Sequence, residues 1–361
     1  MRDTLRDYER AGVANNFGLL RLLAAMLVLL SHAWPLSGNP AEYLSVTVGL
    51  SFGTVAVNVF FAVSGFLVCG SYLRNPKLGG FLWRRGLRLF PGLMVAALVA
   101  PALAFISSGL DASAYFASID FARFVGHNAS LLGGVQYSLH DAFAGNPAPR
   151  AINGSLWTLP YECTFYLACA SLGWLGVLGN RVAFNLGFAA VIVLFAAGNP
   201  SADAQLPGLL LSFLLGAFFQ VNAEQIRMKG LLALLTLLVF YLVFRQVLPM
   251  VCYYFALTYG VLWLAYCAPV PLPGWFDRQD YSYGVYLYAF PMQQLAAWWL
   301  APQGGLSVAN LVWLPLIGTL VLACLSWNLV EKPAQRFKNQ PWQGWLKRGW
   351  LAGKPSLNPG K

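Results

Sequence analysis

Arg21 and His32 are the residues of this chain whose types and spacing are best suited to chemistry. They lie in the apolar segment NNFGLLRLLAAMLVLLSHAWPLSG at residues 15–38. In a helix, their separation in sequence puts them about 20° apart in azimuth and about 16 Å apart in height. Ionisable groups inside apolar helices are costly to bury and are therefore often functional. The alternative is that Arg21 extends to a membrane interface and His32 ends the helix beside Trp34.

Glu162 is a carboxylate inside another apolar run, NGSLWTLPYECTFYL at residues 153–167. Such a charge must be paired, or the carboxyl group must stay protonated. We therefore expect a functional role for Glu162.

Three arginines, Arg84, Arg85 and Arg88, follow the second apolar run. In a helix, Arg84 and Arg88 share a face and Arg85 lies beside them. Guanidinium groups bind phosphates through paired hydrogen bonds, so this cluster is a candidate phosphate clamp. The alternative is a charge cluster that ends membrane insertion and contacts lipid headgroups.

Small and polar residues, among them Asn58, Ser64 and Gly65, interrupt the aromatic-rich run at residues 57–74. Such residues permit close packing of helices, which is their ordinary explanation. The alternative is that they line a route for an extended ligand.

The composition indicates a polytopic membrane protein. Of 361 residues, 58% are hydrophobic and 10% are charged, and the mean hydropathy is +0.60, whereas soluble domains carry about 25% charged residues. The net charge of +10 lies in short segments between apolar runs, which is a topological signal and argues against nucleic-acid binding. The first apolar run is expected to be a retained signal anchor, because it contains an arginine and lacks a small-residue cleavage site.

The cysteines and histidines show no pattern typical of a disulfide framework or a metal site. The six cysteines all lie in or beside apolar runs without a CxxC motif. The three histidines lack metal-ligand spacing as well. We expect the cysteines to be small packing residues, and we expect no metal site.

Apolar runs of about 20 residues predict an all-α protein with about ten transmembrane helices. The expected spans are 17–36, 51–72, 87–107, 157–178, 183–199, 206–222, 230–249, 251–268, 282–300 and 309–330.

Lysine and arginine placement predicts that both termini are cytoplasmic. Of the 23 such residues, all except Arg123, Arg150 and Arg245 fall in alternate connecting segments. These segments are 1–21, 73–88, 179–182, 223–229, 269–281 and 331–361. We expect a cytoplasmic segment at 1–16, a transmembrane domain at 17–337 and a cytoplasmic tail at 338–361. The segment 108–156, on the other side, either covers an acceptor site or only connects spans.

The order of these features resembles the acyltransferase-3 family of bacterial membrane O-acyltransferases over residues 15–337. The motifs that carry the resemblance are Arg21 with His32, FFAVSGFL at 60–67, R-R-x-x-R at 84–88, NGSLWTLPYE at 153–162, SYGVYLYAFP at 282–291 and LVEKPAQRF at 329–337. Two departures stand out. The family often has a histidine or another polar group where this chain has Tyr288 and Ala289. Many relatives also carry a soluble esterase-like domain, which is not expected here.

The resemblance implies transfer of an acyl group, usually acetyl, from cytoplasmic acyl-CoA to a hydroxyl of a cell-surface glycan or lipid-linked saccharide. It also implies a multi-pass protein of the bacterial inner membrane, in contact with membrane lipids. The sequence leaves a homo-oligomer open. The residues expected to bind the donor, acetyl-CoA, are Arg21, Ser64, Arg84, Arg85 and Arg88.

His32 and Glu162 are the expected catalytic residues. A neutral imidazole can take a proton from the attacking hydroxyl, or it can accept the acyl group as a nucleophile. Glu162 is the candidate to orient and stabilise that imidazole, as a carboxylate does in hydrolase triads.

Two rival functions fit parts of the sequence. A glycolipid transporter or flippase also buries charges near the membrane midplane, but it commonly has repeated halves, and we find no internal repeat. An assembly scaffold explains the hydrophobicity but not the register of Arg21 and His32.

Overall fold

The computed structural model describes residues 3–12, 15–39, 42–198, 205–246, 249–268, 270, 273 and 279–340. Every regular element in these ranges is a helix, and the pairing of Thr4 with Arg227 is an isolated bridge. The expectation of an all-helical protein is therefore confirmed.

The helices follow the chain as α1 (Leu5–Arg10), α2 (Phe17–Leu36), α3 (Tyr43–Val48), α4 (Phe52–Arg74), α5 (Leu78–Ala104), α6 (Ala112–Phe116), α7 (Ile119–Ser130), α8 (Leu159–Trp174), α9 (Arg181–Gly198), α10 (Gln205–Val221), α11 (Gly230–Phe244), α12 (Met250–Tyr266), α13 (Ser282–Leu300), α14 (Val308–Ser326) and α15 (Lys332–Gln335). A 3₁₀ turn, η2 (Gly154–Thr158), precedes α8, and a π-helix, η4 (Trp327–Glu331), joins α14 to α15. Short 3₁₀ turns also occupy Phe105–Ser107, Ala301–Gln303 and Arg336–Asn339.

Each of the expected spans coincides with one helix, and α2 and α13 have the expected bounds. The largest difference is at α5, which begins at Leu78 instead of residue 87. Hydropathy alone predicts that this span begins at the arginine cluster. Arginine is a good helix former, so the helix continues through the cluster.

Five helical stretches are long and apolar enough to cross a membrane: Phe17–Leu36, Phe52–Arg74, Leu78–Ser107, Arg181–Gly198 and Val308–Asn339. Three shorter apolar helices, Gln205–Val221, Gly230–Phe244 and Met250–Tyr266, accompany them. Neither α8 nor α13 is among these eight. Multiple membrane-spanning helices are thus supported, while the count of ten stays a prediction.

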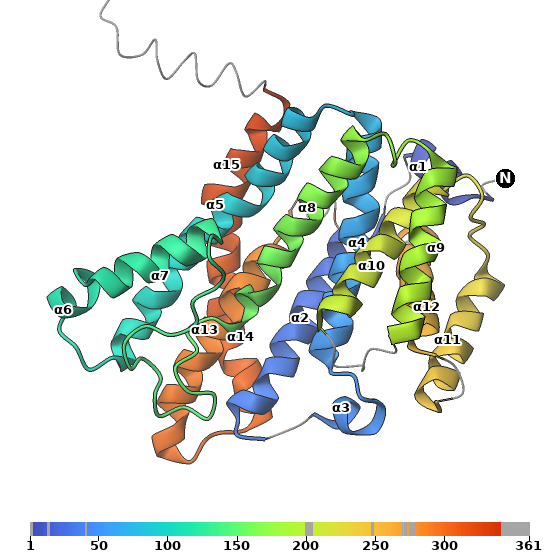
Figure 1. The fold of residues 1–361 in the computed structure, drawn as a ribbon. Helices are drawn as coiled ribbons and strands as arrows, with labels where there is room; N and C mark the ends of the chain where they lie inside the picture. Colours follow the sequence, from blue (N-terminus) through green and yellow to red (C-terminus); the bar gives the residue numbers. More distant parts are fainter. Residues whose placement is uncertain are drawn as a thin grey trace, which may run out of the picture.

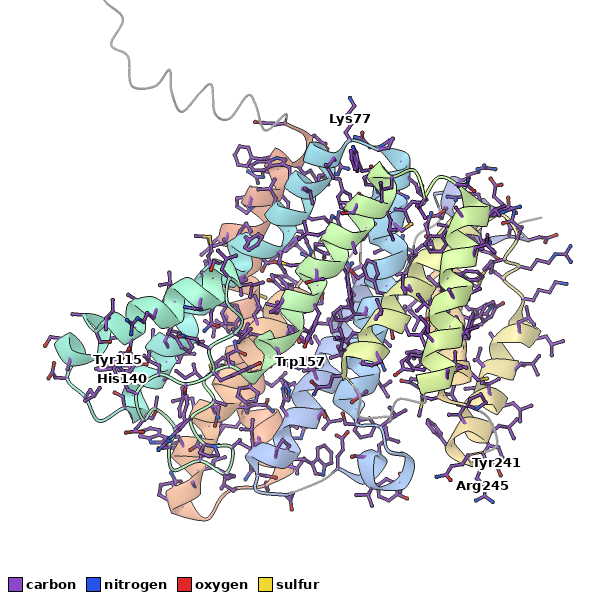
Figure 2. The ribbon with its side chains drawn as sticks, in the orientation of Figure 1. Lys77, Tyr115, His140, Trp157, Tyr241 and Arg245 are labelled. Carbon is purple, nitrogen blue, oxygen red and sulfur yellow. The ribbon has the colours of Figure 1, made fainter. Side chains whose placement is uncertain are left out.

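Several described parts of the segments expected to be cytoplasmic lie at one end of the bundle. In Figure 1, α1, the turn between α4 and α5, the start of α9 and α15 lie at the upper end. Lys77 and Arg245 lie at opposite ends in Figure 2, as the charge pattern predicts. From segment 108–156, α6 and α7 extend to the side of the bundle (Figure 1).

Helices α4 and α10 form the most extensive helix contact of the described chain. Glycines on both helices allow this close approach. A Cβ atom at Gly65 would lie 1.9 Å from the Phe213 carbonyl oxygen, and one at Gly216 would lie 2.1 Å from the Ala62 carbonyl oxygen. The small residues of α4 therefore have the ordinary packing role at Gly65.

We expect Gly216→Ala to destabilise the protein by about 1–3 kcal/mol, because the new methyl group must push α4 and α10 apart. Gly187→Ala on α9 is the matched control, since a Cβ atom there has no heavy atom within 4 Å. Thermal unfolding of both variants in detergent measures the difference. Equal stability of the two variants would show that the α4–α10 contact is looser than this structure has it.

Candidate active site

One carboxylate, Asp280, binds two buried arginines. Asp280 Oδ2 lies 2.9 Å from Arg21 Nη2 and 2.7 Å from Arg88 Nη2. Arg88 Nη1 also lies 3.6 Å from Glu331 Oε2. The four side chains are 24% or less exposed. This ion cluster therefore joins α2, α5, the start of α13 and the π-helix η4.

Local structure holds both carboxylates in place. The Ser282 hydroxyl donates to Asp280 Oδ1 at 2.5 Å, and the Ser326 hydroxyl donates to Glu331 Oε1 at 2.9 Å. Burial alone would raise the pKa of Asp280, but the Arg88 and Arg21 guanidinium groups outweigh burial and lower this pKa below its ordinary value. Asp280 is therefore a carboxylate at neutral pH.

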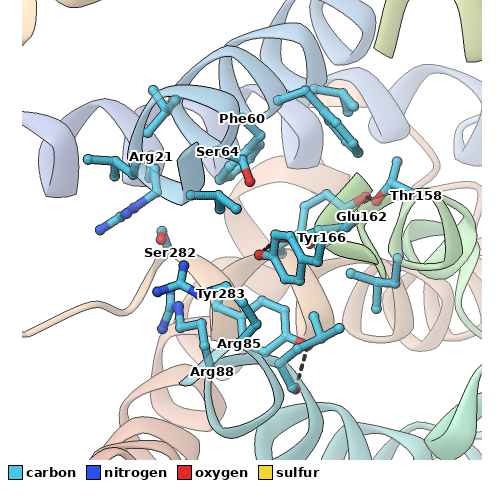
Figure 3. A pocket seen from close by; sticks show the side chains of 18 residues that line it. Arg21, Phe60, Ser64, Arg85, Arg88, Thr158, Glu162, Tyr166, Ser282 and Tyr283 are labelled. Carbon is cyan, nitrogen blue, oxygen red and sulfur yellow. Dashed lines mark hydrogen bonds between the residues drawn. The ribbon is translucent and has the colours of Figure 1, made fainter. Parts of the chain in front are cut away.

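A cavity of about 110 Å³, here called the arginine cavity, lies beside the ion cluster. The side chains that line it come from α2, α4, α5, α8 and α13 (Figure 3). Five of the seven residues expected at the site line it: Arg21, Ser64, Arg85, Arg88 and Glu162.

Aromatic side chains pack against the cavity arginines. The Arg85 guanidinium lies 5.9 Å from the centre of the Tyr166 ring, and that of Arg88 lies 5.6 Å from the Tyr283 ring. The Tyr166 hydroxyl donates to Glu162. Within the described ranges, Arg85 forms no ion pair with a carboxylate, so its charge faces the cavity uncompensated by direct contact.

Arg84 does not line the arginine cavity. The sequence analysis placed Arg84 and Arg88 on one face with Arg85 beside them, but the pair that shares the cavity wall is Arg85 and Arg88. Residues three apart are also neighbours on a helix surface. The direction of the adjacent helices decides which of the two pairs faces inward.

His32 lines a second cavity of about 190 Å³, here called the histidine cavity. Its ring meets Phe290 edge-on, with ring centres 5.0 Å apart. Two side chains, Val57 and Tyr286, line both cavities and so stand between them. The Tyr286 hydroxyl donates to the Ser155 carbonyl oxygen at 2.7 Å and lies 2.7 Å from the Thr158 hydroxyl oxygen.

The expected pairing of Glu162 with His32 is wrong for this structure. In the described chain no hydrogen bond or ion pair joins them, and they line different cavities separated by Tyr286. His32 Nδ1 is buried and has no hydrogen-bond partner among the described residues. The physical reason is that α8 directs Glu162 into the arginine cavity, where its carboxyl group accepts from Tyr166.

Asp280, Glu331 and Tyr286 are the site residues that the sequence analysis missed. Tyr286 and Glu331 lie in motifs that carried the family resemblance, and Asp280 lies two residues before one of them, but no role was assigned to any of the three. The signal that could have found the two carboxylates is charge balance, because two buried arginines require buried anions.

Two further observations complete the site. In the residues that the structure describes, no group of three or more His, Cys, Asp or Glu side chains is arranged to hold a metal ion. All six cysteines are free.

Comparison with known proteins identifies the family of the chain. The acyltransferase-domain model of the acyltransferase-3 family matches residues 15–330, which is most of the chain. The chain belongs to the acyltransferase-3 family. An O-acetyl transferase of Shigella phage Sf6 is 32% identical over 88% of this chain and 95% of its own length. Nodulation protein 10 of Rhizobium leguminosarum bv. viciae is 28% identical over 91% of this chain and 95% of its own length. No solved structure matches significantly.

We expect Asp280→Asn to destabilise the protein by about 3–5 kcal/mol at pH 7, because it leaves two buried guanidinium groups without their shared anion. Because the folded-state pKa of Asp280 is lowered, its contribution is present above about pH 4 and lost as the pH falls further. Thermal unfolding measures both effects.

Asp120→Asn is the matched control for Asp280→Asn. Asp120 pairs with Arg123 at 3.5 Å, but the two side chains are 60% and 63% exposed. We expect a change within about 0.5 kcal/mol. If Asp280→Asn lowers stability no more than Asp120→Asn does, the ion cluster contributes nothing to stability.

Proposed function

We propose that this family member is a membrane O-acyltransferase that moves an acetyl group from acetyl-CoA to a hydroxyl of a cell-surface glycan or lipid-linked saccharide. The observation that carries the proposal is the pair of cavities in one helix bundle. One is cationic and the other contains His32, and among the described residues Val57 and Tyr286 line both. The O-acetyl transferase named among the relatives supports acetyl as the acyl group.

Arg21, Arg85 and Arg88 bind the phosphates of the donor in this proposal. Arg21 Nε and Arg85 Nε are buried without a hydrogen-bond partner among the described residues, and Arg88 Nη1 has only its 3.6 Å ion pair with Glu331. Arg84 Nη2 is also buried without a partner there, but Arg84 does not line the cavity. Guanidinium groups with unused donors favour phosphate oxygens. Ser64 lines the same cavity as these arginines. Arg84 would act only at the outer edge of that cavity.

Helix α2 sets the distance between the two ends of the reaction. Arg21 and His32 lie on this one helix, about 16 Å apart along its axis. That length is comparable to the length of a pantetheine arm. When Arg21 holds the donor phosphates in the arginine cavity, the thioester can therefore extend past Tyr286 to His32 in the histidine cavity.

His32 is the general base of the proposed reaction. Its imidazole takes the proton of the acceptor hydroxyl while the hydroxyl oxygen attacks the thioester carbonyl carbon. The carbon–sulfur bond then breaks, and the proton passes from His32 to the thiolate sulfur. The products are the O-acyl ester and CoA as its thiol, and the imidazole returns to its neutral form.

In this proposal, Glu162 acts in the arginine cavity, where the donor binds, and not beside His32. Its carboxylate accepts from Tyr166 and faces three cavity arginines. It therefore limits the net positive charge of the arginine cavity, which lets the product CoA leave.

We further propose ten spans with both termini in the cytoplasm, in the inner membrane of a bacterium. The gathering of Lys77 and α1 at the end opposite Arg245 supports this orientation (Figures 1 and 2). A topology reporter fused after Lys361 should report cytoplasm, and one inserted near Gly134 should report the other side. A C-terminus outside the cytoplasm would refute the ten-span topology.

We expect Arg85→Gln to weaken acetyl-CoA binding by about tenfold or more, because a charge-assisted hydrogen bond to phosphate contributes about 1.5–3 kcal/mol. Arg84→Gln should have a smaller effect, since Arg84 lies next in sequence but outside the cavity lining. Equilibrium binding of radiolabelled acetyl-CoA to the purified proteins measures both. If Arg84→Gln has the larger effect, the donor phosphates bind elsewhere on α5.

We expect His32→Ala to lower acetyl transfer by about 10²–10⁴-fold, as the loss of a general base does. Donor binding and thermal stability should stay near those of the wild type, and both can be measured on the same purified sample. A loss of stability with little loss of turnover would assign His32 to packing alone. Donor binding without transfer by the wild-type protein would favour the transporter or flippase function instead.

A further inference from the structure

We infer that the histidine cavity is the acceptor subsite and that it accepts an uncharged saccharide ring, with Asn58 and Trp157 as the residues that select it. This inference rests on the proposed function and names its second substrate site.

The lining of the histidine cavity is polar but uncharged. Hydroxyl, amide and aromatic side chains dominate it, and none of the described residues that line it is Lys, Arg, Asp or Glu. Its polar and aromatic members include Ser31, Ser51, Thr54, Asn58, Trp157 and Gln205. The arginine cavity has the opposite character, so anionic and neutral substrates are sorted between the two cavities by charge.

Asn58 Nδ2 carries two N–H donors at this cavity, and the adjacent Tyr253 hydroxyl occupies at most one of them. The Asn58 side chain is 2% exposed, and in the described chain Nδ2 has no hydrogen bond of normal geometry, although the Tyr253 hydroxyl is adjacent. Ser51 and Thr54, in contrast, already bind each other at 2.9 Å. Because a buried amide without a partner is costly, a ligand hydroxyl that accepts from Asn58 Nδ2 recovers this cost.

Trp157 supplies a flat apolar surface beside these polar groups. Trp157 lies in the 3₁₀ turn η2 and lines the histidine cavity, whereas the following residue, Thr158, lines the arginine cavity. Figure 2 places Trp157 in the middle of the bundle. Sugar rings combine C–H faces with hydroxyl edges, which matches an indole face next to an amide and an imidazole.

The position of the cavity also suits a glycan acceptor. Its volume of about 190 Å³ is larger than the roughly 150 Å³ of an engineered cavity that binds benzene. Residues at the starts of α4 and α10, Ser51 and Gln205, line it. It therefore lies towards the end of the bundle opposite Lys77, where the proposed topology places the glycan (Figure 2).

The binding test uses a pair of cysteine variants in nanodiscs, Thr54→Cys in the histidine cavity and Ser64→Cys in the arginine cavity. Maleimide labelling is measured against the wild-type protein, which corrects for the six native free cysteines. The probes are octyl glycosides of glucose, galactose, mannose and rhamnose, with octanol as the apolar control. We expect at least one glycoside to slow labelling of Thr54→Cys more than octanol does, and acetyl-CoA alone to slow labelling of Ser64→Cys.

The kinetic test uses host membranes that contain the native glycan and radiolabelled acetyl-CoA. Asn58→Leu and Trp157→Leu should lower acetylation of the glycan about tenfold or more, as expected for a lost buried hydrogen bond or stacking surface. Their apparent KM for acetyl-CoA and their melting temperatures should stay unchanged. Trp157→Phe keeps a flat ring and should retain most of the activity.

Two outcomes would overturn the inference. One is that octanol protects Thr54→Cys as well as every glycoside, which would make the cavity a lipid site. The other is that the Asn58 and Trp157 variants acetylate the glycan normally. Protection by a glycoside with no acetyl transfer by the wild-type protein would keep the saccharide subsite and refute the proposed enzyme function.

Discussion

The buried carboxylate of Asp280 is the interaction on which the rest of this structure depends. Arg21 and Arg88 come from helices that are distant in sequence, and each would be prohibitively costly to bury alone. Sharing one oxygen atom of Asp280 fixes the start of α13 against α2 and α5. Glu331 adds a second anion from the π-helix, so the cluster closes around one side of the arginine cavity.

This arrangement leaves two cavities of different character in one bundle. Close packing fills the contact between α4 and α10, where Gly65 and Gly216 bring the two helices together. The hydrogen bonds of Tyr286 to Ser155 and Thr158 hold its ring between the cavities. In the function proposed above, a charged donor and a neutral acceptor bind separately and meet along one helix, α2, which carries Arg21 and His32.

Much of this was determined by the sequence. Hydropathy located each long helix to within a few residues, except at α5, because burial in lipid or protein requires continuous apolar surface. The helical repeat placed Arg21 and His32 on one helix, and the motif order led to the family. The residues Arg21, Ser64, Arg85, Arg88 and Glu162 were named in advance, and they do line one cavity.

The tertiary structure alone decided how side chains from different helices meet. It placed Glu162 with the arginines and Tyr166 instead of with His32, and it turned Arg85 rather than Arg84 towards the cavity. It also identified Asp280 as the shared anion. The reason is that the 3.6-residue repeat fixes relative positions only within one helix, whereas the rotation and tilt of neighbouring helices follow from packing and from the pairing of buried charges.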